Sequence, residues 1–153
     1  MGYFSDHIYL TKVEITRMNK VLLPTAGLVI IRKKKVLLAF SRNKQAFYLP
    51  GGKVDAGETA VQALIREIRE EMNICISPNE LTFFMHITAL AFGESKDIIM
   101  EQDCFMYDLQ SSLTPGAEIG ELRFFSFEEY LKEEHLVPGV IILFEELEKR
   151  RLI

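Results

Sequence analysis

Apolar and polar positions recur with two different periods along the chain, and the clearest period is helical. Between Thr59 and Met72 the apolar residues follow the three- and four-residue spacing of one helix face. At about 100° per residue they lie within about 50° of a common direction, so this face is expected to be buried. The residues of the predicted buried face are Val61, Leu64, Ile65, Ile68 and Met72.

Shorter apolar runs, rich in β-branched and aromatic residues, predict strands on both sides of this helix. Residues 25–31 and 36–40 surround a basic turn, which predicts a hairpin. Residues 47–52, with the sequence FYLPGG, are expected to form a loop, because Pro ends regular structure and paired glycines permit unusual backbone angles. Further strands are expected at 7–15, 81–92, 98–109 and 122–127, and further helices at 128–133 and 139–150.

This mixture of strands and helices predicts an α/β or α+β sandwich. The 153 residues suit a single domain spanning 1–153, and no linker or repeat divides them. The net charge of -4 argues against nonspecific binding to a nucleic acid polymer, which needs a basic surface. No apolar run is long enough to span a membrane and no secretory signal is recognised, so the cytoplasm is the expected compartment.

The cysteines and histidines show no pattern that indicates a site. Cys75 and Cys104 are far apart and are expected to be buried free thiols. His7, His86 and His135 are isolated in the sequence. We therefore expect them to be hydrogen-bonded or solvated rather than catalytic.

Three carboxylates share one flank of the central helix. Glu67 and Glu71 are four residues apart, about 80 to 120° from the buried face, and Glu70 lies further outward. Two glutamates at this spacing repel each other, and a divalent cation such as Mg²⁺, which prefers oxygen ligands, would remove the conflict. From the helix alone, a solvated acidic face paired with Arg66 and Arg69 is the simpler interpretation.

The residues upstream of the helix favour the metal site over the solvated acidic face. The segment from Gly52 to Ile74 reads GKVDAGETAVQALIREIREEMNI and resembles the Nudix box, which is a Gly, five residues, a Glu, seven residues, Arg-Glu, an aliphatic residue, any residue, Glu-Glu, any residue, Gly and an aliphatic residue. By chance such a match would occur on the order of once in 10⁷ starting positions. Asn73 stands where the box has Gly, a mild change because Asn is the next choice for a left-handed residue after a helix. The matching residues are Gly52, Glu58, Arg66, Glu67, Ile68, Glu70, Glu71 and Ile74.

The resemblance implies the family's α/β/α sandwich with a mixed central sheet, and hydrolysis of a diphosphate bond in a nucleotide-like small molecule. It implies Mg²⁺ as cofactor, with Mn²⁺ able to substitute, and water as the nucleophile that attacks phosphorus. By the same resemblance, Glu67, Glu70, Glu71 and the backbone carbonyl of Gly51 are metal ligands. A salt bridge between Arg66 and Glu58 would orient the loop and the helix around the metal.

The substrate remains open, because members of the family share the box and differ in the rest of the pocket. A nucleoside triphosphate is our first choice, and ADP-ribose or a nucleotide sugar is the alternative. A third interpretation is a Nudix domain that binds nucleotides without catalysis, but the complete carboxylate set favours an enzyme. Isopentenyl diphosphate isomerases share the fold, but Cys75 and Cys104 do not match the arrangement of that class.

Substrate-binding residues are expected close to the box. Gly51 and Gly52 would allow phosphate or metal to approach the backbone. Phe47 and Tyr48 are candidates for stacking on a base, with core packing of one and exposure of the other as the equal alternative.

Other residues stay undecided at this level. Arg42 and Lys44 are candidates to bind a terminal phosphate, although solvated loop charges are the simpler interpretation. An additional Glu outside the box assists the metal in some family members, and the sequence does not choose between the candidates. Assembly as a homodimer is also open. The candidate glutamates are Glu101, Glu118 and Glu121.

Overall fold

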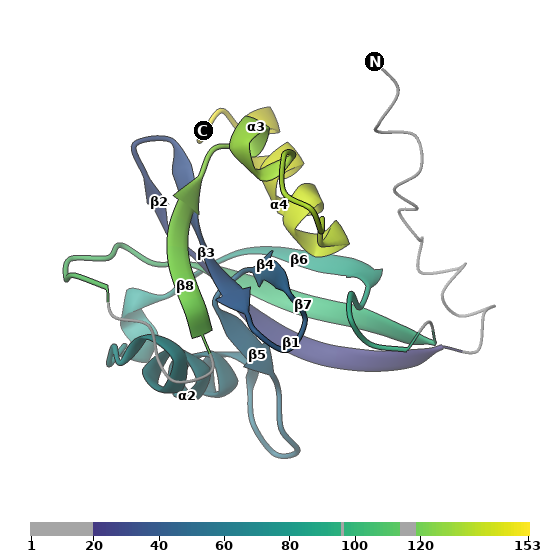
Figure 1. The fold of residues 1–153 in the computed structure, drawn as a ribbon. Coiled ribbons are helices and arrows are strands. Elements are labelled where there is room, and N and C mark those ends of the chain that lie inside the picture. The colour runs from purple at the N-terminus through teal and green to yellow at the C-terminus, as the bar shows by residue number, and fades with distance from the viewer. Residues whose placement is uncertain (1–19, 96, 114–118) are drawn as a thin grey trace.

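The strands form two sheets in the computed structural model, which describes residues 20–95, 97–113 and 119–153 (Figure 1). In the first sheet the order is β5-β1-β7-β6, with β1 and β7 parallel and the other pairs antiparallel. In the second sheet β3 pairs with β2, β4 and β8, always antiparallel. The strands are β1 (Val21–Val29), β2 (Ile31–Arg32), β3 (Lys35–Ser41), β4 (Ala46–Tyr48), β5 (Gly51–Lys53), β6 (Thr82–Leu90), β7 (Ile98–Met106) and β8 (Ile119–Phe125).

Helices cover the strands from two sides. Helix α2 (Ala60–Met72) lies on one side, and α3 (Phe127–Tyr130) and α4 (Pro138–Lys149) lie on the other (Figure 1). A short 3₁₀ turn, Pro78–Glu80, precedes β6. The predicted mixed α/β architecture is confirmed. The strand predicted at 7–15 and the candidate Glu118 lie outside the described residues.

The strand predicted at 25–31 is divided between the two sheets. β1 ends at Val29, and the chain enters the second sheet at Ile31. The carbonyl of Ile30 between them accepts a hydrogen bond from the Leu37 amide. The predicted hairpin is therefore confirmed only for its tip, where β2 and β3 pair, because the longer β1 pairs with β7 instead.

Capping residues close both ends of helix α2. The Thr59 hydroxyl accepts a hydrogen bond from the Gln62 amide, and the Gln62 side chain accepts one from the Thr59 amide. Asn73 has φ 55° and ψ 37°, the left-handed conformation expected at the end of the helix. Val61 and Ile65 are only partly buried, so the buried face is narrower than the pattern predicts. Its buried residues are Ala63, Leu64, Ile68 and Met72.

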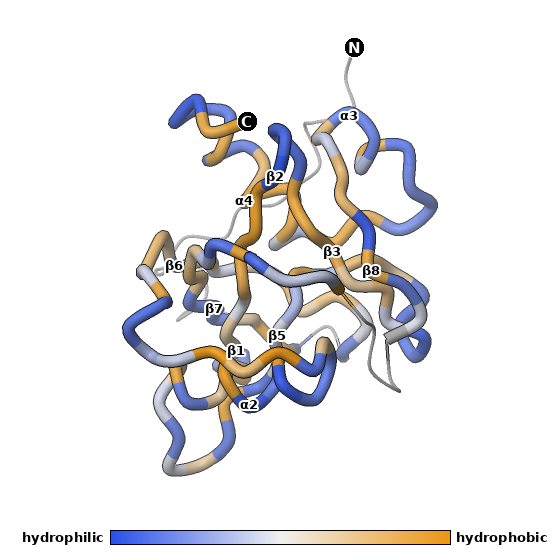
Figure 2. Tube along the Cα trace, turned by 90° about the vertical axis from the view of Figure 1, so that its left-hand side faces the viewer, coloured by the Kyte–Doolittle hydropathy of each residue, from blue (hydrophilic) through white to orange (hydrophobic). Residues whose placement is uncertain are grey.

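Two hydrophobic clusters fill the interior. One joins α2 to β1 and β7, and the other joins α4 to both sheets. Figure 2 shows hydrophobic positions along β3 and α4 and hydrophilic ones at the exposed turns. Phe47 belongs to the second cluster, 4% exposed, with its ring centroid 4.7 Å from that of Phe125. The hypothesis that Phe47 stacks on a base is therefore wrong, because its ring is used in the core.

The two thiols differ in their environment. Cys104 is buried as expected, whereas Cys75 is exposed, so that part of the prediction is wrong. Cys75 follows the end of α2 and lies between Ile74 and Ile76, whose side chains are the ones that enter the core. None of the helices in the described ranges is long and apolar enough to cross a membrane.

Candidate active site

The segment predicted as a loop at 47–52 folds as two short strands joined by Leu49 and Pro50. β5 pairs with β1 so that Gly51 lies opposite Gly27. Gly51 has φ +139°, and a Cβ added there would lie 2.0 Å from the Ala26 carbonyl oxygen. The loop is therefore confined to Leu49 and Pro50, and the rest of that expectation is wrong, because Gly51 pairs with β1 in a backbone conformation in which a Cβ would collide with the neighbouring strand.

The second glycine of this pair faces the central helix. A Cβ on Gly52 would lie 2.5 Å from Cδ of Glu67. The amide of Gly51 donates a hydrogen bond to Oε2 of Glu71 at 3.0 Å. β5 and two of the helix carboxylates are therefore in direct contact, as the resemblance implies for a bare backbone next to the site.

Arg66 holds the loop before the helix. Its Nε and Nη2 donate to the two carboxylate oxygens of Glu58 at 2.9 and 2.8 Å, and Nη2 also donates to the Lys53 carbonyl at 3.1 Å. These hydrogen bonds from Arg66 lower the pKa of Glu58 to about 2. The predicted salt bridge between Arg66 and Glu58 is confirmed, and its paired geometry fixes the loop to the helix.

The three glutamates of the helix differ in exposure. The Glu67 side chain is 19% exposed and accepts a hydrogen bond from Arg66 at 2.8 Å, whereas the Glu70 side chain is 61% exposed. Burial raises the pKa of Glu67, although Arg66 beside it acts in the opposite direction. Within the described ranges, no three carboxylate, histidine or cysteine side chains converge closely enough to enclose a metal ion. In this arrangement Glu67 is held by Arg66, and Glu71 accepts from the Gly51 amide.

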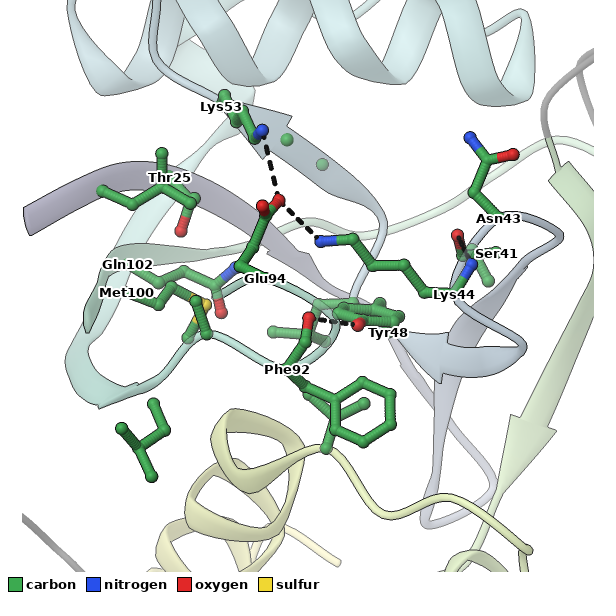
Figure 3. Close-up of a pocket in the computed structure, with 18 of the residues that line it drawn as sticks. Thr25, Ser41, Asn43, Lys44, Tyr48, Lys53, Phe92, Glu94, Met100 and Gln102 are labelled. Carbon is green, nitrogen blue, oxygen red and sulfur yellow. Dashed lines mark hydrogen bonds and ion pairs between the residues drawn. The ribbon is translucent and has the colours of Figure 1, made fainter. Parts of the chain in front are cut away.

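A cavity of about 200 Å³ opens beside these glutamates (Figure 3). Glu71, Gly51 and Gly52 line one part of it. Tyr48 lines another part, so of the two aromatic candidates only Tyr48 reaches the cavity. The remaining wall is largely apolar and comes from β1, β6, β7 and the β6–β7 loop. Its main residues are Leu23, Thr25, Leu90, Phe92, Met100 and Gln102.

A double ion pair holds the β6–β7 loop at the cavity. The carboxylate of Glu94 lies 3.0 Å from Nζ of Lys44 and 3.2 Å from Nζ of Lys53, and Figure 3 shows it between them. The two lysines hold the pKa of Glu94 below its usual range. The Tyr48 hydroxyl donates to the Phe92 carbonyl at 2.8 Å. Three separate segments therefore meet at this wall.

The sequence did not indicate several of these residues. Lys44 was a candidate and lines the cavity, whereas Arg42 does not line it. The side chains of Thr25, Lys53, Glu94 and Gln102 carry no local motif. Only the pairing of distant strands brings them to the cavity, so no signal along the chain could have identified them.

The other candidate glutamates lie away from the cavity. Glu101 lies between Met100 and Gln102 on β7, so it points to the opposite face of the sheet. There it accepts a hydrogen bond from Thr88 at 2.8 Å and contacts His86. His86 also contacts Asp103, which confirms that this histidine is hydrogen-bonded. Glu121 is on β8 of the second sheet, with its side chain 53% exposed.

Comparisons with known proteins agree with this geometry. The sequence model of the NUDIX domain matches residues 21–143. Comparison with curated proteins returned no match. The solution structure of the E. coli ORF135 protein is 29% identical to this chain, covers 86% of this chain and 92% of that chain, and has a TM-score of 0.64.

Two further solved structures share the fold. The MutT protein from Methanosarcina mazei Go1 is 20% identical, covers 86% of this chain and 96% of that chain, and has a TM-score of 0.70. A bifunctional NMN adenylyltransferase/ADP ribose pyrophosphatase from Francisella tularensis, complexed with AMP and a Mn ion, is 21% identical, with 90% of this chain and 46% of that chain covered and a TM-score of 0.64. Since the domain match extends over most of the chain and includes the whole glutamate helix, the chain belongs to the Nudix family of pyrophosphohydrolases, which act on phosphoric anhydrides.

Proposed function

We propose that this chain hydrolyses a diphosphate bond in a nucleoside triphosphate and depends on a divalent metal ion. The observation that carries the proposal is the continuity of one cavity. Glu71 and Gly51 line it on one side, and Tyr48 and Phe92 line it on another. A nucleotide has the same two parts, a charged diphosphate and a flat ring, joined within one small molecule.

The glutamate helix suits a hard divalent cation in its chemistry. Glu67, Glu70, Glu71 and the Gly51 carbonyl would hold the ion, and all of them offer oxygen, the donor that Mg²⁺ and Mn²⁺ accept. Because burial raises the pKa of Glu67 even beside Arg66, an adjacent cation would stabilise its charged form. When bound, the ion would neutralise charge on the diphosphate and increase the acidity of an attacking water.

The remaining residues position the substrate. Arg66 ties Glu58 and the Lys53 carbonyl to the helix, which restrains the loop between β5 and α2. Lys44 and Lys53 bring positive charge to a cavity in a protein of net charge -4. They are the cavity's local cations for a polyphosphate.

The size of the cavity bears on the choice of substrate. At about 200 Å³ it is smaller than the roughly 300 to 1,000 Å³ of most ligand sites, so it suits one ring system. A nucleoside triphosphate has its single nucleoside at one end. ADP-ribose, with a sugar beyond the diphosphate, needs a second enclosed region that this cavity does not offer.

A substrate panel in ¹⁸O-labelled water tests the proposal. The panel contains the common ribo- and deoxyribonucleoside triphosphates, ADP-ribose, a nucleotide sugar and a dinucleoside polyphosphate, with products separated by chromatography and weighed by mass spectrometry. We expect the highest kcat/KM with a nucleoside triphosphate, and label in a phosphate-containing product. Label found only on carbon would exclude attack at phosphorus. Absence of turnover with every compound would support a binding-only domain.

Removal of metal is expected to abolish hydrolysis. Excess EDTA should stop turnover, and added Mg²⁺ or Mn²⁺ should restore it. Binding of the ion should also raise the free energy of unfolding, by about 2.7 kcal/mol at 100 times its Kd. Thermal unfolding with and without metal measures this rise independently of activity, and the rise should be smaller in Glu70→Gln. Full activity in excess EDTA would contradict the metal assignment.

A further inference from the structure

The hydroxyl of Thr25 is a buried polar atom at the wall of the cavity. Thr25 is 9% exposed, and in the part of the chain that the structure describes its Oγ1 is buried without a hydrogen-bond partner. Such a group lowers stability, because it loses its bonds to water and gains none from the protein. Valine has nearly the same shape and would avoid this cost. A ligand that enters the cavity can supply the missing hydrogen bond.

A second polar side chain stands next to this hydroxyl. Thr25 on β1 and Gln102 on β7 are paired in register in the parallel ladder, and both line the cavity. Figure 3 shows the two side chains beside each other. Gly27 leaves room for the amide of Gln102, since a Cβ there would lie 3.1 Å from Nε2. The protein contact of this amide is long, 3.7 Å from the Cys104 thiol, a weak donor.

The surface around this polar pair is apolar. Leu23 and Met100 form the register pair two residues earlier and line the same cavity. Tyr48 and Phe92 face them from another wall, with ring centroids 6.2 Å apart. The pair lies close to the reaction site, because Thr25 is directly opposite Lys53 in the β1–β5 ladder, two residues from Gly51.

We propose that Thr25 and Gln102 bind the hydrogen-bonding edge of a nucleobase, and that Thr25 determines which base is preferred. The inference rests on the proposed function and adds the group that the cavity recognises. A hydroxyl offers one donor and an acceptor oxygen, and a carboxamide offers two donors and an acceptor oxygen, all without net charge. A base edge carries neighbouring donors and acceptors on a flat apolar ring, which suits the surrounding wall.

A phosphate does not suit this position. Thr25 and Gln102 carry no charge, and the Glu94 carboxylate lines the same cavity. A phosphate at the polar pair would therefore have to compete with Glu94 for the two lysines that this carboxylate already contacts. The two lysines that contact Glu94 are the cations of this cavity, and they lie on β5 and on the β3–β4 connection.

Thr25→Val tests the role of the hydroxyl with little change of shape. Without nucleotide, we expect this variant to melt about 2 to 4 °C higher, because the unpaired buried hydroxyl is gone. For the preferred nucleoside triphosphate we expect kcat/KM to fall about tenfold, mainly through KM. With the purine or pyrimidine analogue that lacks the exocyclic edge groups as substrate, the variant and the parent protein should have the same kcat/KM. Gln102→Leu should reduce the same discrimination, and Thr25→Ser should retain it.

Thr88→Val is the matched control. The Thr88 hydroxyl donates to Glu101 at 2.8 Å, and Thr88 does not line the cavity. This variant should not melt higher, and its preference among bases should be unchanged. A Thr25→Val protein that melts lower and keeps full base discrimination would overturn the inference.

Further measurements show whether the pair binds the base or the sugar, and whether it acts in binding or in catalysis. If Thr25→Val changes the preference between ribo- and deoxyribonucleotides but not between bases, the pair binds the sugar and the nucleobase proposal is wrong. Calorimetric binding of nucleoside monophosphates separates recognition from catalysis. If monophosphates bind in a way that depends on Thr25 but no triphosphate is hydrolysed, the inference stands and the proposed substrate is wrong. If triphosphates are hydrolysed with the same base preference in Thr25→Val, the proposed substrate stands and the inference is wrong.

Discussion

Glu71→Gln is expected to lower kcat about 10³-fold while the protein stays folded. Loss of one anionic ligand of a catalytic cation removes several kcal/mol of transition-state stabilisation, and about 4 kcal/mol corresponds to this factor. The fold is preserved because the glutamine carbonyl has the shape to accept the same hydrogen bond from the Gly51 amide. Steady-state kinetics at saturating metal and a thermal melt measure the two effects separately.

The control for this substitution lies on another helix. Glu128 on α3 has a side chain that is 86% exposed and lies 3.7 Å from Lys132. Glu128→Gln removes the same charge away from the cavity and should leave kcat unchanged. Glu70→Gln should resemble Glu71→Gln in its kinetics. If both helix variants turned over at the parent rate, the assignment of the metal site to this helix would be wrong.

Gly52→Ala is expected to lower activity, whereas Gly51→Ala is expected to lower stability. In Gly52→Ala the new methyl meets the end of the flexible Glu67 side chain, which can move aside. Displacement of that carboxylate by about 1 Å is expected to cost about 10²-fold in kcat with little loss of stability. In Gly51→Ala the methyl meets the rigid Ala26 backbone at a φ of +139°, so the free energy of unfolding should fall by about 3 kcal/mol or more.

Denaturant unfolding and kcat, measured on both variants, distinguish these effects. Gly57→Ala is the matched control, because Gly57 also has a positive φ, +83°, but an added Cβ would meet nothing within 4 Å. It should cost about 1 kcal/mol from backbone strain alone. A Gly51→Ala protein as stable as Gly57→Ala would show that the contact with Ala26 does not destabilise the fold. Full activity in Gly52→Ala would show that the position of Glu67 is not critical.

Features that depend on neighbours along the chain could be predicted from the amino-acid sequence. The apolar period predicted a helix from Thr59 to Met72, and Asn73 was expected as the left-handed residue after it; the helix observed is Ala60–Met72, followed by Asn73 in that conformation. The ion pair of Arg66 with Glu58 followed from the resemblance to the Nudix box, whose spacing places Glu58 in the loop just before the helix and Arg66 eight residues further on, within it. These features involve short separations, so local conformational preference and side-chain geometry suffice to specify them.

How the strands divide between the sheets, and which side chains form the cavity, depend on contacts between distant parts of the chain. Phe47 and Tyr48 are adjacent and similar, yet one ring is in the core and the other lines the cavity. Successive residues of a strand point to opposite faces, and the packing of the two sheets determines which face is buried. Thr25 and Gln102 meet only through the register of two parallel strands that are separated by about half of the chain. Such register depends on the burial of whole faces, so it cannot be derived from a segment of sequence considered alone.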